Sequence, residues 1–61
     1  MEEELLQKIY NLLNEMYQST NELRMKSGIN WYRVERILNE LASQKKAEKL
    51  ELNKRTCWRK F

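Results

Sequence analysis

The sequence predicts a single α+β domain, residues 1–61, with three helices followed by a C-terminal β-hairpin. Three observations lead to this prediction. Apolar residues recur at helical spacing before residue 18, two further helical patterns flank Gly28, and two short strand-like runs end the chain. A chain this short lies near the lower limit for independent folding, since it buries only about 60% of the surface that its unfolded form exposes.

The first helix is expected from about Glu2 to Glu15, with glutamates in the first turn that complement the positive end of the helix dipole. At 100° per residue it carries two neighbouring apolar stripes. One stripe consists of Leu5, Ile9, Leu12 and Met16. The other consists of Leu6, Tyr10, Leu13 and Tyr17. The second stripe belongs either to the core or to a dimer face, and the pattern leaves both interpretations open.

A second, shorter helix is expected from Thr20 to Ser27, after a brief strand at Tyr17-Gln18 that pairs with the hairpin. Ser19 or Thr20 caps this helix, and Ser19 with Glu22 three residues later fits a capping box. Gly28 is the only glycine and follows directly. Because glycine adopts positive φ without a steric penalty, this position predicts a sharp turn between two helices.

The third helix is expected from about Asn30 to Gln44. Its apolar positions, which should face inward, are Val34, Ile37, Leu38 and Leu41. Its outward positions are Tyr32, Arg36, Asn39 and Ser43, with Arg33 beside them. Any surface helix has a polar outer face, but a large aromatic residue such as Tyr32 at its centre is less expected on a face that only meets water.

Residues 47–52 and 56–61 predict two strands around the polar turn Asn53-Lys54-Arg55. This turn contains no glycine, so we expect either a loop longer than two residues or a strained one. Trp58 should pack on the third helix with its indole N–H at the rim of the core. The basic residues of the hairpin favour phosphate binding, although charges also protect ordinary edge strands against aggregation.

The spacing of Leu23, Gly28, Ile29, Val34 and Ile37 resembles a helix-turn-helix. With the hairpin that follows, nearly the whole chain resembles the winged-helix family, and small stand-alone members of archaea, their viruses and mobile elements in particular. Arg24 departs from the pattern, because a small residue usually stands there between the two helices. The resemblance implies that the third helix lies in the major groove of DNA and that the hairpin lies along the backbone or in the minor groove. Winged helices also serve as protein-interaction modules.

Charge is unevenly distributed: residues 1–22 carry a formal charge of −4 and residues 23–61 carry +7. One part of the molecule should therefore attract a polyanion that the other part repels. The chain has no histidine and a single cysteine, Cys57, which excludes a structural zinc site on ligand count. With no histidine general base, no glycine-rich phosphate loop and no paired carboxylates, we expect neither an enzyme nor a cofactor nor a small-molecule substrate.

The single cysteine and the N-terminal segment also predict the cellular compartment of the protein. A free thiol without disulfides favours a reducing, cytoplasmic environment, and Cys57 is interpreted as a small apolar strand residue. The acidic segment MEEELLQKIY has no long apolar run, so we expect neither a signal peptide nor a membrane span.

These observations together predict a DNA-binding protein, a transcriptional regulator, with double-stranded DNA and a second copy of the chain as partners. The expected base contacts are Tyr32, Arg33, Arg36 and Asn39. The expected backbone contacts are Thr20, Asn21, Ser43, Lys54, Arg55, Arg59 and Lys60. The expected dimer face is the second stripe of the first helix: Leu6, Tyr10, Leu13 and Tyr17.

Two other functions compete with this prediction. A protein-interaction subunit of a larger assembly would account for the wide apolar arc of the first helix and for the glutamates on the third. A binder of left-handed DNA or double-stranded RNA is indicated by CWRKF, which is similar to the last strand of the Zα family. That family's asparagine and tyrosine on the third helix would fall at Glu35 and Asn39, so its motif is absent and this function ranks lowest.

Overall fold

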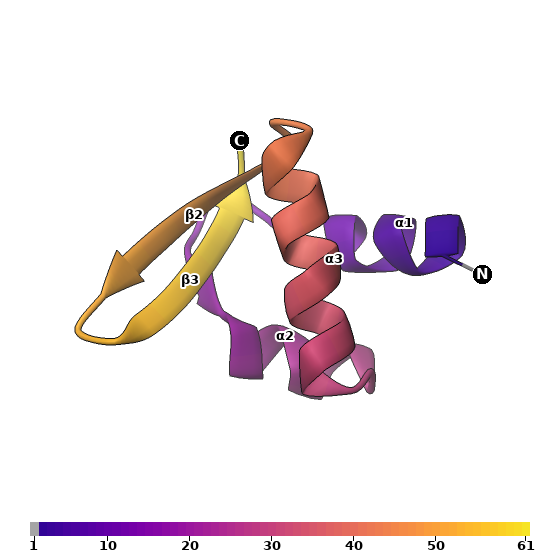
Figure 1. Ribbon diagram of the computed structural model, residues 1–61, viewed down its shortest axis with the longest axis horizontal. Coiled ribbons are helices and arrows are strands. Elements are labelled where there is room, and N and C mark those ends of the chain that lie inside the picture. Colours follow the sequence, from indigo (N-terminus) through magenta and orange to yellow (C-terminus); the bar gives the residue numbers. More distant parts are fainter. Residues whose placement is uncertain (1) are drawn as a thin grey trace.

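The computed structural model describes residues 2–61 and contains three helices and a three-stranded antiparallel sheet. In chain order the elements are α1 (Glu2–Leu12), β1 (Gln18–Ser19), α2 (Thr20–Ser27), α3 (Trp31–Ser43), β2 (Ala47–Leu52) and β3 (Arg55–Lys60). Figure 1 shows α3 in the middle of the molecule, with the β2–β3 hairpin on one side and α1 on the other. The predicted α+β class is confirmed, and the arrangement is compatible with a winged helix.

Helix α1 ends at Leu12, which corrects the expected end near Glu15. The side-chain amide of Gln18 donates to the Leu12 carbonyl at 2.9 Å, and the Asn14 side chain accepts from the backbone N–H of Met16 at 2.7 Å. These polar contacts satisfy backbone groups at the end of the helix and turn the chain away from its axis. Met16 therefore leaves the first apolar stripe and is 74% exposed.

The sheet has the strand order β1-β3-β2, so β3 lies in the centre and β2 forms an outer edge. Trp58 in β3 pairs with Gln18 in β1 and with Lys49 in β2. The brief first strand is thus confirmed, but it is Gln18–Ser19, one residue later than expected.

The hairpin turn consists of two residues, Asn53 and Lys54, between the closing pair Leu52 and Arg55. Both turn residues have positive φ, 49° and 65°, as a type I′ turn requires. Of the two predicted alternatives the strained short turn is the one found, and Arg55 opens β3 instead of lying in the turn. Asparagine tolerates this conformation, whereas Lys54 adopts it against its preference.

The hydrophobic core lies between the helices and the inner face of the sheet. Its apolar side chains are at most 3% exposed: Ile9, Leu13, Leu23, Val34, Ile37, Leu38, Leu41, Ala47 and Trp58. Leu13 is therefore a core residue, as one of the two interpretations of the second stripe predicted, and its place in the expected dimer face is corrected. The four inward positions predicted for the third helix are confirmed.

Local capping explains why α2 and α3 begin and end where they do. Ser19, the cap of α2, accepts from the Glu22 backbone N–H at 3.0 Å, as the capping box predicts. Gly28 has φ 72° and donates its N–H to the Arg24 carbonyl at 2.9 Å, which is the predicted left-handed end of α2. Asn30 then caps α3 by accepting from the backbone N–H of Tyr32.

Candidate nucleic-acid interface

The outward face of α3 (Tyr32, Arg33, Arg36, Asn39 and Ser43) is exposed along its whole length. Tyr32 is 78% exposed, and its ring meets the Trp31 ring edge-to-face with centroids 5.3 Å apart. Asn30, Tyr32, Arg33 and Arg36 border one shallow depression on this face. Three of the four predicted base contacts therefore border the same depression, together with the residue that caps the helix.

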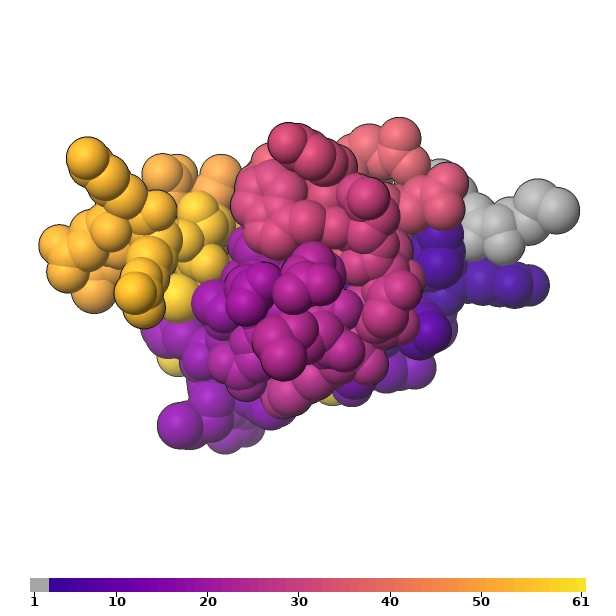
Figure 2. All heavy atoms as spheres, turned by 90° about the horizontal axis from the view of Figure 1, so that it is seen from below, coloured from indigo at the N-terminus to yellow at the C-terminus, as the bar shows by residue number. Residues whose placement is uncertain are grey.

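A groove separates the start of the two helices from the hairpin. We call it the hairpin groove, and it is lined by Ser19, Thr20, Asn21, Trp31, Glu35, Lys54, Arg55 and Thr56. Figure 2 shows this side of the molecule, with the hairpin beside the starts of α2 and α3 and with α1 at the far end. The groove brings the predicted backbone contacts Asn21, Lys54 and Arg55 together, although they come from two distant parts of the sequence.

Asn39 connects the outward face of α3 to the hairpin. Its side-chain oxygen lies 3.5 Å from the Nζ of Lys49, and the same Nζ lies 5.5 Å from the centroid of the Trp58 ring. Sequence reasoning missed both Lys49 and Trp31 as parts of this region. The alternation of side chains along β2 is the signal that could have identified Lys49. Lys49 is directly opposite Trp58, so its side chain lies on the same, inner face of the sheet.

Three of the predicted backbone contacts use their side chains within the fold. Thr20 is only 4% exposed, and its hydroxyl oxygen accepts from the indole N–H of Trp58, which removes it from a phosphate-binding role. The Asn21 side chain is exposed but bonds within α2, accepting from Arg24 Nε at 3.1 Å. Ser43 donates its hydroxyl to the Glu40 carbonyl at 2.7 Å, as serines in helices often do.

Arg59 and Lys60, the other two basic residues predicted to contact the DNA backbone, lie at the end of β3 away from the hairpin tip (Asn53, Lys54 and Arg55). Arg59 forms an ion pair with Glu48 on the outer face of the sheet. Its guanidinium carbon also lies 4.7 Å from the centroid of the Tyr17 ring. Lys60, at the opposite end of β3 from the tip, places its Nζ 4.9 Å from the centroid of the Tyr10 ring.

The contacts of Glu48 shift the acid–base behaviour of this outer cluster (Tyr17, Glu48 and Arg59). Hydrogen bonds from Arg59 and from the Tyr17 hydroxyl, the latter 2.9 Å long, lower the pKa of Glu48. The hydrogen bond to Glu48 raises the pKa of Tyr17 and also that of Arg59. The three groups contact one another, so this cluster joins β2 and β3 to the residue that precedes β1, and it is not part of the hairpin groove.

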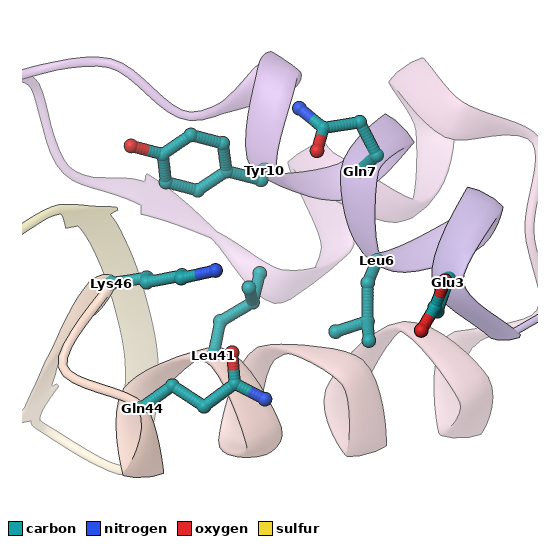
Figure 3. Close-up of a pocket in the computed structure, with 7 residues that line it drawn as sticks. All are labelled: Glu3, Leu6, Gln7, Tyr10, Leu41, Gln44 and Lys46. Carbon is teal, nitrogen blue, oxygen red and sulfur yellow. The ribbon is translucent and has the colours of Figure 1, made fainter.

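The four residues of the expected dimer face do not form one surface. Leu6 and Tyr10 are half-buried and line a groove between α1 and α3, where Leu41 forms part of the wall (Figure 3). Leu13 is in the core, and Tyr17 belongs to the outer cluster. Figure 3 also shows that Glu3 and Lys46 lie at opposite ends of this groove.

Comparison with known proteins found no matching family model, curated protein or solved structure. In residues 2–61 no helix combines the length and apolar character that a membrane crossing demands. The same residues hold no group of three side chains that could ligate a metal ion.

Proposed function

We propose that this protein binds double-stranded DNA, with the outward face of α3 in the major groove and the hairpin tip on the backbone. The observation that supports this proposal is the hairpin groove. Lys54 and Arg55 line it opposite Trp31 and Asn21, directly beside the face that carries Arg33 and Arg36. A helix and a basic hairpin that share one side of the molecule can contact a base edge and the neighbouring phosphates at the same time.

The proposed base-reading residues are Tyr32, Arg33 and Arg36, with Asn39 further along α3. Arginine can pair with guanine O6 and N7, and asparagine can pair with adenine N6 and N7. Asn39 would first exchange its contact with Lys49 for the base. Lys54 and Arg55 would neutralise phosphates, and Glu35 inside the groove would repel them unless it accepts from a cytosine amine.

The charge distribution supports the same orientation. The acidic residues Glu3 and Glu4 belong to α1, on the other side of α3 from the hairpin (Figure 1). A duplex on the hairpin side would therefore meet the basic part of the chain and avoid the acidic part. The role we propose is that of a regulator of transcription. The compartment we propose is one that holds DNA, namely the cytoplasm of a cell without a nucleus.

A second candidate function, protein interaction, is favoured by one specific observation. Met16 and Phe61 are 74% and 77% exposed, and the segments that hold them meet where the Lys60 N–H donates to the Asn14 carbonyl at 2.8 Å. Large apolar side chains that are exposed to water are candidate contact points for a protein partner.

A salt-titrated binding assay decides between the two functions. Fluorescence anisotropy of random-sequence duplexes should report an affinity that falls steeply with salt, because each neutralised phosphate releases counterions. Selection of bound sequences should then yield a preferred site. Absence of binding at low salt would reject DNA binding and leave protein interaction as the better account.

A further inference from the structure

The outer edge of β2 is open: in the sheet of residues 2–61, β2 pairs with β3 on one side and with no strand on the other. Leu52 and Arg55 close a two-residue turn, so this pair exchanges both backbone hydrogen bonds. Alternation along the strand then directs the backbone groups of Leu50 toward β3 and those of Lys49 and Glu51 toward the open edge. The Phe61 N–H, which donates to the Lys46 carbonyl, agrees with this alternation.

The sequence of this edge is complementary to itself in one antiparallel register. If two β2 strands meet with Leu50 opposite Leu50, then Lys49 of each copy stands opposite Glu51 of the other. These are the residues whose N–H and C=O groups point outward, so each pair can exchange two backbone hydrogen bonds. Shifting the axis to Lys49 or to Glu51 places like charges opposite each other, which is destabilising.

The charged side chains at this edge are partly exposed to water. Lys49 and Glu51 share the inner face of the sheet, where Nζ and Oε1 lie 3.5 Å apart and the side chains are 39% and 70% exposed. On the outer face, Leu50 is half-buried and Leu52 is 60% exposed, which is unusual for a leucine on an edge strand. Pairing around Leu50 would bring the leucines of both copies into one apolar strip.

We propose that two copies of this chain associate through β2, antiparallel and two-fold symmetric about Leu50, so that the two hairpins form one continuous sheet. The Lys49–Glu51 pairs fix the register, and the apolar strip of Leu50 and Leu52 adds contact on the outer face. The two-fold axis is perpendicular to the sheet, so both α3 helices lie on the same face of the continuous sheet. This assembly does not depend on the proposed DNA binding, and it replaces α1 as the dimer contact.

Disulfide trapping tests the register. Cys57 is the only cysteine, so Leu50→Cys in a Cys57→Ser background carries one thiol at the axis. Directly opposite residues of a non-hydrogen-bonded pair have Cα atoms about 4.5 Å apart, within the range of a disulfide. Leu52→Cys with Cys57→Ser is the matched control, since its thiols would lie about 14 Å apart along the strands.

Under mild oxidation, without DNA, the Leu50→Cys chain should form covalent dimer about tenfold faster than the Leu52→Cys chain. The greater exposure of Leu52 biases the comparison against this result. Equal rates, or a native chain that remains monomeric in sedimentation equilibrium at millimolar concentration, would overturn the proposal. Fast trapping through Gln7→Cys on the α1–α3 groove, with slow trapping through Leu50→Cys, would also overturn it and assign the contact to α1.

Charge exchange between chains tests the pairing itself. Two further variants are made in the chain that carries Leu50→Cys and Cys57→Ser. Lys49→Glu leaves glutamate at positions 49 and 51, and Glu51→Lys leaves lysine at both positions. Each variant alone should therefore form the disulfide-linked dimer slowly. Mixed, they should trap rapidly as the heterodimer, because every cross-strand pair is then opposite in charge. Circular dichroism melts check that both variants fold. No contact within one chain can produce this rescue, so its absence between folded variants would contradict the proposed register.

Discussion

The indole N–H of Trp58 donates to the hydroxyl oxygen of Thr20 at 2.8 Å, and both side chains are buried. Trp58 lies in the central strand of the sheet, and Thr20 is the first residue of α2. This bond therefore joins the hairpin to the start of α2 through the core. It also explains why a side chain as large as tryptophan can be fully buried here, because its one polar group has a partner.

Replacing Thr20 by valine should lower the free energy of unfolding by about 1–3 kcal/mol, because the buried indole N–H would lose its acceptor. Valine keeps the shape of threonine, so the loss would not come from a cavity. Urea denaturation followed by Trp fluorescence or circular dichroism gives the measurement. Thr20→Ser, which keeps the hydroxyl, should be closer to the native chain, and a valine variant as stable as the serine variant would argue against the bond.

Arg36→Ala should weaken binding to the preferred DNA by about 1–3 kcal/mol and relax the preference at one base pair. The reason is the place of Arg36 on the depression that it shares with Tyr32 and Arg33. Selection of bound sequences with the variant, compared with the native chain, gives the measurement. Equal losses on preferred and on random DNA would assign Arg36 to phosphate contact alone.

Lys54→Ala combined with Arg55→Ala should weaken binding to all sequences alike and reduce the magnitude of the salt slope by about two. Both residues lie at the hairpin tip and line the hairpin groove. Lys60→Ala is a matched control, since Lys60 belongs to the same strand as Arg55 but contacts the Tyr10 ring at its other end. An unchanged slope in the double variant would place the tip away from the duplex, and an equal fall in the control would show that the effect is not specific to the tip.

The sequence predicted those elements whose signals are local. Three features were predicted in this way: the cap at Ser19, the left-handed turn at Gly28 and the four inward residues of α3. Each depends only on the type or the spacing of residues that are close together in the chain, whatever the rest of the fold. The class of fold followed from the order of these elements.

The errors in the sequence interpretation came from contacts between residues distant in the chain. Leu13 and Tyr17 share one stripe on a helical wheel, but α1 ends at Leu12, so the first enters the core and the second joins the sheet. Thr20 was assigned to a phosphate, yet it is held in the core by Trp58, which lies 38 residues away. The sequence also did not predict the partner of Arg59, which is Glu48, 11 residues away. Periodicity cannot report such partners, because they depend on how the strands pair.

The outer cluster makes stability depend on pH in a direction that can be derived. Arg59 and Tyr17 both donate to Glu48 and lower its pKa in the folded state below the ordinary value. The contribution of Glu48 to stability is therefore fully present above the pKa that Glu48 has in the unfolded chain, and it is lost as pH falls through the lowered pKa of the folded state.

At neutral pH the native chain should melt at a higher temperature than the Glu48→Gln variant, and this difference should shrink as the solution becomes strongly acidic. Tyr17→Phe removes one of the two donors and should reduce the acid dependence only in part. Melting curves of the native and glutamine chains that stay parallel over the whole acid range would mean that the Glu48 carboxylate does not stabilise the sheet.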